Sequence, residues 1–487
     1  MNLCLLWHPF AWNEARARHA LETVAGLLGW PWRSAPLGAA IGSSEVVIYA
    51  GPLADAPPDA AAAIECTGWP EWPLESLTVA RFEDAPMLAP AGGLAKGPDP
   101  RAFPAGWLRA IGFLLGAEED RLDPRRDEWE CFKGTWSRRQ DVLDEPSVNR
   151  AAGQLARRIE QDAASRGIGT PRAPLWKDSA RFAVALTHDV DDVSLHSWAG
   201  AFRLLGRARS PRGYAMRGGL TALARAVTAP RGRDPYWSFD RWAAEEEKRG
   251  FRSSFYFVPP DRAASHEYDP TYTWSDLIDF EGRRVTVSQM MKQLATRGFD
   301  IGLHGGYLSH RSGEELSRQK QSVERASGAA AAGIRQHFLR FDPAATWSAQ
   351  DQAGFRYDTT FGFNEAVGFR AGIAAPFHPW NATRGGKHEL LELPLTLMDG
   401  TLFRNLGLDG EAAARRTREH LERVEAAGGL AVLLWHPNAA DEQRFPGWWS
   451  SYLATLDWLA DRAAWVTHAA EIAAWWRERE KTLRLEG

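Results

Sequence analysis

The sequence is poor in cysteine and lacks any long apolar run. Its 487 residues include only three cysteines, Cys4, Cys66 and Cys131, which lie far apart and form no CxxC pair. An odd, scattered set of this kind argues against a disulfide framework and against a cysteine-bound zinc ion, and it favours a reducing compartment. No stretch reaches the roughly 18 consecutive apolar residues that a membrane-spanning helix needs.

The chain also lacks an excess of charge of one sign. Its formal net charge is −4, which gives no overall reason to expect nucleic acid as a partner. The first residues, "MNLCLLWHPFAWNEARARH", hold a short apolar run with no basic residue before it. We do not interpret this stretch as a signal peptide, so the expected location is the cytoplasm.

A Gly/Pro-rich stretch, "GIGTPRAP" at 167–174, divides the sequence into two parts. Before it we expect a buried strand at 44–51, a long loop at 84–105 and helices at 106–116 and 146–167. After it, apolar runs alternate with helical stretches, which is typical of parallel strands joined by helices. The sequence therefore predicts an α/β domain of unknown role at 1–170 and a second α/β domain at 177–487.

The apolar runs of the second domain end at residues that can carry chemistry. "RFAVALTHD" ends at Asp189, "GFDIGLH" at His304 and "LAVLLWH" at His436, and "AGIRQH" delivers Arg335 and His337. The carboxyl ends of parallel strands lie at one face of a barrel or open sheet, where active sites assemble. We therefore expect these side chains to share one site.

The segment "ALTHDVDD" brings three carboxylates together after an apolar run. Side chains two apart on an extended segment point the same way, so Asp189 and Asp191 should face together. Their repulsion is relieved if a metal ion binds one and the other serves as a base; a turn or helix cap is the alternative reading of such a motif. "LHGGYLSH" adds His304 and His310, and two imidazoles with one carboxylate suit Zn²⁺, or equally non-haem Fe²⁺.

From about Phe182 to Trp476 the chain resembles the NodB-type polysaccharide deacetylases, carbohydrate esterase family four. Five motifs occur in the family's order: "THDVD", "LHGGYLSH", "GIRQHF", "LELPLTLMD" and "LLWHP". The resemblance implies a distorted (β/α) barrel and a divalent metal, which we expect to be zinc. It also implies catalytic roles for Asp189, Arg335, Asp399 and His436, with Asp189 as the base and His436 as the acid, and it makes Asp191 and His304 metal ligands.

Two motifs depart from the family pattern. His304 and His310 are six residues apart where the family has four, and His337 stands where the family has proline. If His310 does not reach the metal, the third ligand is lost or is replaced. We take His310 as the third ligand and keep His337, beside Arg335 at a strand end, as the alternative.

Between Asp192 and Asp234 lies an insertion, at about 195–235, that contains arginine but no Asp, Glu or Lys. Its arginines are Arg203, Arg207, Arg209, Arg212, Arg217, Arg225, Arg231 and Arg233. One interpretation is a solvated, partly helical loop. The other is a clamp for an anion, because Arg suits phosphate; a nucleotide sugar, a lipid-linked phosphate or an anionic membrane surface would all qualify.

These features predict a deacetylase that hydrolyses the N-acetyl group of an amino sugar or glycan precursor during assembly of cell-surface polysaccharide. The expected substrate is a carbohydrate or sugar phosphate, contacted by Trp435, Tyr307 and Arg340, since aromatic faces stack on sugar rings. Two alternatives stay open: hydrolysis of another amide on a small non-sugar molecule, and an inactive homologue that binds glycan.

Overall fold

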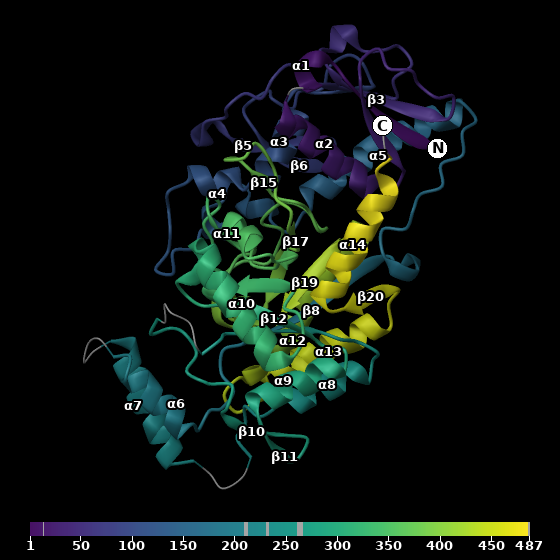
Figure 1. Cartoon of the computed structure of the whole chain (residues 1–487). Helices are drawn as coiled ribbons and strands as arrows, with labels where there is room; N and C mark the ends of the chain where they lie inside the picture. The colour runs from purple at the N-terminus through teal and green to yellow at the C-terminus, as the bar shows by residue number, and fades with distance from the viewer. Residues whose placement is uncertain (13, 209–212, 230–232, 261–265, 486–487) are drawn as a thin grey trace.

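The computed structural model describes residues 1–12, 14–208, 213–229, 233–260 and 266–485. Figure 1 shows two sheets with their helices, one built from the first part of the chain and one from the rest. In both sheets every pair of neighbouring strands is parallel, so the α/β class expected from the alternating apolar and helical segments is confirmed.

The N-terminal sheet has five strands in the order β2-β1-β3-β4-β7. The expected strand at 44–51 and helices at 106–116 and 146–167 correspond to β3, α3 and α5. The loop expected at 84–105 instead contains β6, because Met87 and Leu88 are buried against the core, and it also contains β7. The elements are β1 (Asn2–Trp7), α1 (Pro9–Trp12), α2 (Ala15–Leu28), β2 (Trp32–Pro36), β3 (Glu45–Gly51), β4 (Ala62–Glu65), the antiparallel pair β5 (Thr78–Phe82) and β6 (Ala85–Ala89), β7 (Ala102–Phe103), α3 (Gly106–Leu115), α4 (Glu118–Leu122) and α5 (Ser147–Ser165).

The second sheet follows the order β17-β14-β13-β12-β9-β8-β19-β18, and β20 also pairs with β8. The two ends of this path, β17 and β18, are separated in the chain only by Leu393 and Pro394, so the sheet curls round into a distorted (β/α) barrel. Its strands are β8 (Phe182–Val190), β9 (Ser254–Phe257), β12 (Asp300–Gly305), β13 (Gly333–Gln336), β14 (Tyr357–Asp358), β17 (Leu391–Glu392), β18 (Leu395–Met398), β19 (Leu430–Leu434) and β20 (Ala464–Thr467).

Helices cover the outside of the barrel: α9 and α10 pack against β12, α12 against β19 and α14 against β8. The helices of this part are α6 (Trp198–Leu205), α7 (Tyr214–Val227), α8 (Phe239–Glu247), α9 (Val287–Thr296), α10 (Gly313–Ser327), α11 (Thr346–Gln352), α12 (Gly410–Ala426), α13 (Trp448–Ala460) and α14 (Ala469–Leu483). Two small antiparallel pairs are β10 (Leu277–Phe280) with β11 (Arg283–Thr286), and β15 (Trp380–Asn381) with β16 (Gly386–Lys387).

Strand β8 is buried on both faces, which explains its almost unbroken apolar sequence. Its even-numbered residues, such as Val184 and Leu186, pack under the outer helices, whereas Ala183 and Ala185 pack inside the barrel. Because side chains alternate along a strand, the inward face continues through Thr187 to Asp189. The alternation thus carries the first carboxylate into the barrel interior.

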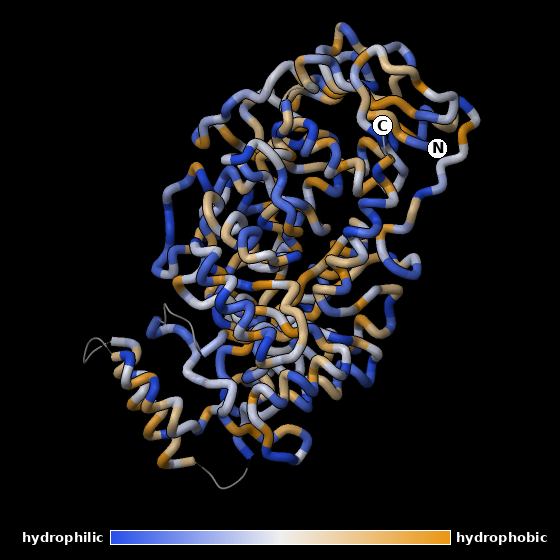
Figure 2. Tube along the Cα trace, in the orientation of Figure 1, coloured by the Kyte–Doolittle hydropathy of each residue, from blue (hydrophilic) through white to orange (hydrophobic). Residues whose placement is uncertain are grey.

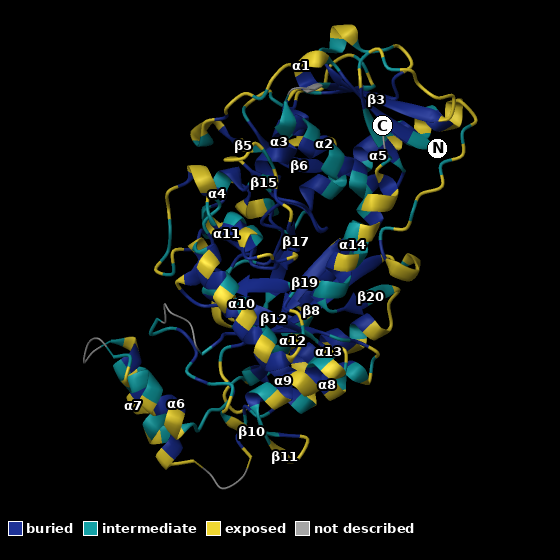
Figure 3. Cartoon of the chain, in the orientation of Figure 1, coloured by how far each residue is buried: buried dark blue, intermediate teal, exposed yellow. Residues whose placement is uncertain are grey.

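The two parts of the chain share packing. One continuous cluster of buried apolar residues, including Leu5, Trp107 and Tyr256, runs from the N-terminal sheet into the barrel (Figure 3). The backbone N–H of Leu485, just after α14, donates to the carbonyl of Trp32 in β2 at 2.8 Å. The proposed division into 1–170 and 177–487 stays a prediction about folding units.

The arginine-containing insertion forms the hairpin of α6 and α7, which projects from the body of the protein (Figure 1). Apolar and polar residues alternate along both helices of the hairpin (Figure 2). Several of the large apolar residues are exposed. Arg209, Arg212 and Arg231 lie outside the described residues. No helix among the described residues combines the length and the apolar character needed to span a bilayer.

Candidate metal centre and hydrolytic site

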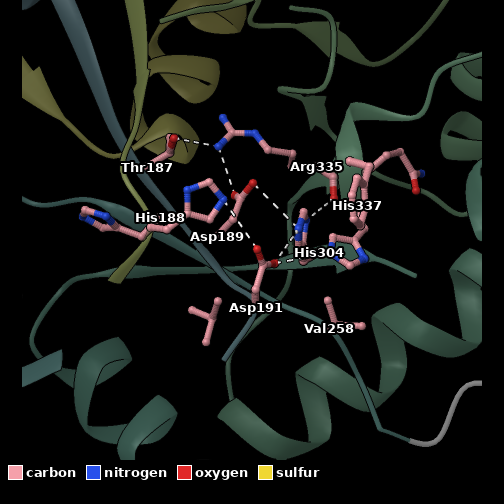
Figure 4. A network of polar contacts seen from close by, with 12 residues as sticks. Thr187, His188, Asp189, Asp191, Val258, His304, Arg335 and His337 are labelled. Carbon is pink, nitrogen blue, oxygen red and sulfur yellow. Dashed lines mark hydrogen bonds and ion pairs between the residues drawn. The ribbon is translucent and has the colours of Figure 1, made fainter. Parts of the chain in front are cut away.

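The candidate site lies where the barrel strands end, as the sequence predicts. Asp189 is the last residue but one of β8, and Asp191 directly follows that strand. His304 lies in β12, and His337 comes directly after β13. Asp399 follows β18 and His436 follows β19. The register places His304 beside Arg335, so the two motifs that carry them are neighbours across one strand pair. Figure 4 shows Asp189, Asp191, His304 and His337 pointing toward one another.

Asp189 is held by the buried guanidinium of Arg335. One oxygen of Asp189 lies 3.1 Å from Nη1 of Arg335, and the same nitrogen donates to the hydroxyl of Thr187 at 2.8 Å (Figure 4). Nε of Arg335 donates to the carbonyl of Thr359 at 3.1 Å. Because the guanidinium is fixed at several points and fully buried, it stabilises an ionised carboxylate in one orientation.

Three side chains converge as a possible ligand set for a cation: Asp191, His304 and His337. One ligand atom from each lies within 4.8 Å of the others. Nδ1 of His304 bonds to the carbonyl of Arg335 at 2.9 Å, and Nδ1 of His337 lies 3.4 Å from a carboxylate oxygen of Asp269. Both rings therefore turn Nε2 toward Asp191, at 3.4 and 3.5 Å. Outer partners of this kind fix the tautomer and orientation of metal-binding histidines.

The electrostatics of this group favour a bound cation. Burial lowers the pKa of His304, but the charges of Asp189 and Asp191 outweigh burial and raise it above its usual value. Oδ1 of Asp191 is buried and makes no hydrogen bond, with only the two imidazoles near it. A divalent cation would satisfy that oxygen and neutralise the carboxylates, and two nitrogens with one oxygen suit Zn²⁺ or Fe²⁺. The residues present therefore fit a metal site.

His310 is not part of this group. It lies in the short 3₁₀ turn Ser309–Arg311, is 4% exposed, and is absent from the cavity that His304 and His337 line. Burial, with the nearby charges of Arg340 and Arg311, lowers its pKa to about 4. Leu308, which stands four residues after His304 where the family has its second histidine, is 44% exposed and cannot bind a metal. The geometry thus favours His337, the alternative, as the third ligand.

His436 forms a close pair with Asp399. Nδ1 of His436 lies 2.8 Å from Oδ1 of Asp399, and the backbone N–H of His436 donates to Oδ2 at 2.7 Å. Burial alone would lower the pKa of His436, but the charge and hydrogen bond of Asp399, followed by the charge of Asp191, raise it to about 9. The imidazole is therefore protonated near neutral pH, and Nε2 faces Asp191 at 3.5 Å. This arrangement suits a proton donor.

A cavity of about 350 Å³ opens over these residues. Asp189, Asp191, His304, His337 and His436 lie in its wall. The segment 127–133, which comes from the N-terminal part of the chain, also lines it, together with residues after β18 and the start of α13. Their side chains include Asp127, Glu128, Trp129, Lys133, Arg404 and Trp448.

The segment 127–133 supports the turn that follows His337. Phe338 in this turn has a positive φ of 60°, which is uncommon for a residue with a side chain. The ring of Trp129 stacks on that of Phe338 with centroids 4.6 Å apart, and the thiol of Cys131 donates to the carbonyl of Phe338 at 3.3 Å. No motif marked this segment in the sequence, because its role depends on a contact across more than 200 residues.

The three residues expected to contact substrate lie elsewhere. Trp435 is fully buried against Tyr452, and Tyr307 and Arg340 are both less than 10% exposed. The guanidinium of Arg340 lies 4.0 Å from the ring centroid of Tyr307, so these two side chains stack on each other. None of the three lines the cavity. In their place Trp129 and Trp448 present aromatic surface there.

Comparison with known proteins gives structural neighbours only. No family model matches the chain, and no curated protein matches it. Among solved structures, the chain is similar to a putative polysaccharide deacetylase from Mycobacterium smegmatis, with 20% identity and a TM-score of 0.42 over 65% of this chain and 98% of that one. It is also similar to Puue allantoinase at 14% identity, and to a probable polysaccharide deacetylase from Pseudomonas aeruginosa PAO1 at 13%; for both, the TM-score is 0.42 over 64% of this chain and 95% of theirs.

Proposed function

We propose that the protein is a metal-dependent hydrolase that removes the acetyl group from an N-acetylated amino sugar or glycan precursor. One observation carries this proposal: a single cavity is lined by a possible metal-binding group, an arginine-held carboxylate and a protonated imidazole. Hydrolysis of an amide requires a nucleophile, a base and a proton donor, and these three elements meet each need.

Asp191, His304 and His337 would hold the metal, for which zinc is our choice. A divalent metal in such a site lowers the pKa of water and polarises a carbonyl group. With three protein ligands, a tetrahedral metal keeps one position open for water or substrate. Asp269 and the carbonyl of Arg335 keep the two imidazoles in position.

Asp189 would act as the base. Its carboxylate lies beside the ligand group, with Oδ2 3.7 Å from Nε2 of His304, so it can take a proton from water at the same place. Arg335 orients it by a hydrogen bond to Oδ1, and Oδ2 is the oxygen that faces His304. The proton of the attacking water would thus pass to Asp189 as the new carbon–oxygen bond forms.

His436 would supply the proton that the leaving nitrogen needs. When the carbon–nitrogen bond breaks, an amine leaves far more readily if it is protonated, and a neutral imidazole could not provide that proton. Asp399 keeps His436 protonated and fixes Nδ1, which leaves Nε2 facing the cavity. The products are acetate and the free amino sugar.

The substrate proposal rests on the cavity wall. A volume of about 350 Å³ is at the small end of ligand pockets, which suits one sugar unit rather than a stacked polymer. Trp129 and Trp448 offer ring faces, and Lys133 and Arg404 offer positive charge for a sugar phosphate. We expect a cytoplasmic protein, and that location favours a precursor over mature cell-wall polymer.

The test is elemental analysis of purified protein followed by an acetate-release screen. We expect about one divalent metal ion per chain and acetate release from N-acetylamino sugars that a chelator abolishes. Metal without acetate release, but with turnover of another amide, would replace the substrate class. Protein that binds sugar but holds no metal after supplementation would make it an inactive glycan-binding homologue.

A further inference from the structure

The hairpin of α6 and α7 exposes an unusual concentration of large apolar side chains. Five of the eleven such residues that are exposed in the described chain fall within positions 198–227. They are Trp198, Phe202, Tyr214, Leu220 and Val227, with 49–65% of each exposed. Single exposed apolar residues are common, but a cluster of them marks a surface that contacts something else.

The exposed residues of α7 form one stripe along the helix. Tyr214, Arg217, Leu220, Ala224 and Val227 recur at intervals of three or four and are all exposed. On the opposite side the helix packs through glycine: a side chain at Gly219 would lie 2.6 Å from Leu205 of α6. The small residues thus face α6, which leaves the larger apolar ones outside.

Helix α6 adds two aromatic residues to this surface. Trp198 and Phe202 are four residues apart on the same face of α6, and their ring centroids are 6.5 Å apart. Figure 3 shows exposed residues along both helices of the hairpin, away from the buried barrel. The hairpin therefore presents aromatic and aliphatic groups that are about half exposed or more, although the ring of Tyr214 also contacts that of Tyr268 at a centroid distance of 4.9 Å.

The charge of the hairpin is of one sign. Between Val193 and Arg233 the sequence has eight arginines and no acidic residue. Arg203 pairs with Asp276, Arg207 donates to the carbonyls of Asp269 and Pro270, and Arg233 lies 2.7 Å from Asp240, so these three arginines are engaged with neighbouring elements. Arg217, by contrast, lies within the exposed stripe. None of the described residues of the hairpin lines the cavity, so an anion clamp over the substrate stays a prediction.

The stem of the hairpin is fixed close to the metal group. Both carboxylate oxygens of Asp234 accept backbone N–H groups, from Leu195 at 3.0 Å and His196 at 2.9 Å, which ties the two ends together. Leu195 is four residues after Asp191. A partner that binds the hairpin would therefore lie near the strand ends that carry Asp189 and Asp191.

We propose that the α6–α7 hairpin docks the protein onto an anionic lipid surface. Amphipathic helices that carry basic residues together with exposed aromatic and aliphatic residues lie in the membrane interface. Tryptophan and tyrosine are favoured there, and arginine attracts acidic headgroups. A second copy of this chain fits the surface less well, because a two-fold pairing would bring two arginine-rich, acid-free segments together. Docking stands apart from the proposed reaction, although it would suit a glycan carried on a lipid.

The test is co-sedimentation of the full-length protein with vesicles. Phosphatidylcholine vesicles that contain about one third phosphatidylglycerol should bind the protein, and phosphatidylcholine alone should not, because the attraction is partly electrostatic. Binding should weaken as salt rises. The Trp198→Ser/Phe202→Ser variant should lose at least about tenfold in binding, since two large apolar groups no longer enter the interface. Arg217→Gln should lose about fivefold.

Matched controls are Leu122→Ser and Arg415→Gln, which change exposed residues away from the hairpin and should bind as the original protein does. Equal binding to neutral and acidic vesicles, or full binding by the Trp198→Ser/Phe202→Ser variant, would overturn the proposal. So would a dimer in lipid-free solution that this variant abolishes, because the surface would then belong to a second copy. Metal content measured on the same samples keeps this result separate from the test of the hydrolase.

Discussion

The floor and the cover of the cavity arise in different ways. The floor is made by the ends of β8, β12, β13, β18 and β19, which the parallel sheet brings to one edge. The cover includes the segment 127–133, which belongs to the other part of the chain and reaches the site only by tertiary packing. The floor is therefore placed by regular hydrogen bonding between strands, whereas the cover depends on contacts between distant segments, such as that of Trp129 with Phe338.

The largest effect should come from replacing residues of the cavity floor. If these variants kept their metal, the contrast between floor and cover would not hold. Asp191→Ala, His304→Ala and His337→Ala should each weaken metal binding by more than about 100-fold, because each removes one of three ligands. His310→Ala should keep its metal. Elemental analysis of the four proteins, with circular dichroism to confirm the fold, decides this. Metal loss in the His310 variant together with retention in the His337 variant would reverse our assignment.

A second large effect concerns proton transfer. Asp189→Asn should keep the metal and lose about 10²- to 10⁴-fold in kcat, because an amide cannot accept the proton. His436→Ala should behave similarly, with the greatest loss for substrates whose leaving amine is most basic. The control is Asp461→Asn, at an exposed residue after α13 that does not line the cavity. Near-normal turnover in either catalytic variant would remove the role given to that residue.

The displaced histidine predicts an effect on stability rather than on chemistry. The pKa of His310 is about 4 in the folded protein and about 6.5 in an unfolded chain, so above pH 6.5 both states are neutral there. Between pH 6.5 and 4 only the unfolded chain binds the proton, which favours unfolding by roughly 3 kcal/mol across that range. His310→Gln should therefore lose acid sensitivity in this window. Urea unfolding at pH 8, 6 and 5 measures it; parallel pH profiles for the two proteins would contradict a buried neutral His310.

The smallest effect should come from the cover, and it sharpens the comparison. Trp129→Ala should raise KM for a sugar substrate about two- to tenfold by removing a ring face, while metal content stays constant. Trp136→Ala, in the same stretch of chain but outside the cavity, is the matched control. Steady-state kinetics with both variants separates these effects. Unchanged KM in the Trp129 variant would mean that the cover takes no part in binding.

The same contrast explains what the sequence could and could not predict. Asp189, His304, Arg335 and His436 could be placed at one edge from the sequence, because the ends of apolar strands are local patterns and parallel strands bring their ends together. Asp191 followed from its spacing to Asp189, and Asp399 only from the resemblance of "LELPLTLMD" to a family motif; the roles of all six stay predictions. His310 could not be separated from His337 in this way, since a 3₁₀ turn after β12 moves His310 away from the cavity. Trp435 looked suitable beside His436, yet adjacent residues face different ways, and its ring packs against Tyr452.

The edge of the N-terminal sheet is completed by residues far along the chain. Arg479 in α14 donates to the carbonyl of Gly26 across 453 residues, and Leu485 pairs with Trp32. The ribosome releases the N-terminal sheet first, but the outer edge of β2 stays bare until the final helix has emerged. An exposed strand edge invites pairing with other chains. Until residues 469–485 have folded onto it, the β2 edge at Trp32 therefore offers an unpaired backbone carbonyl to other chains, whereas in the finished fold Leu485 occupies that carbonyl.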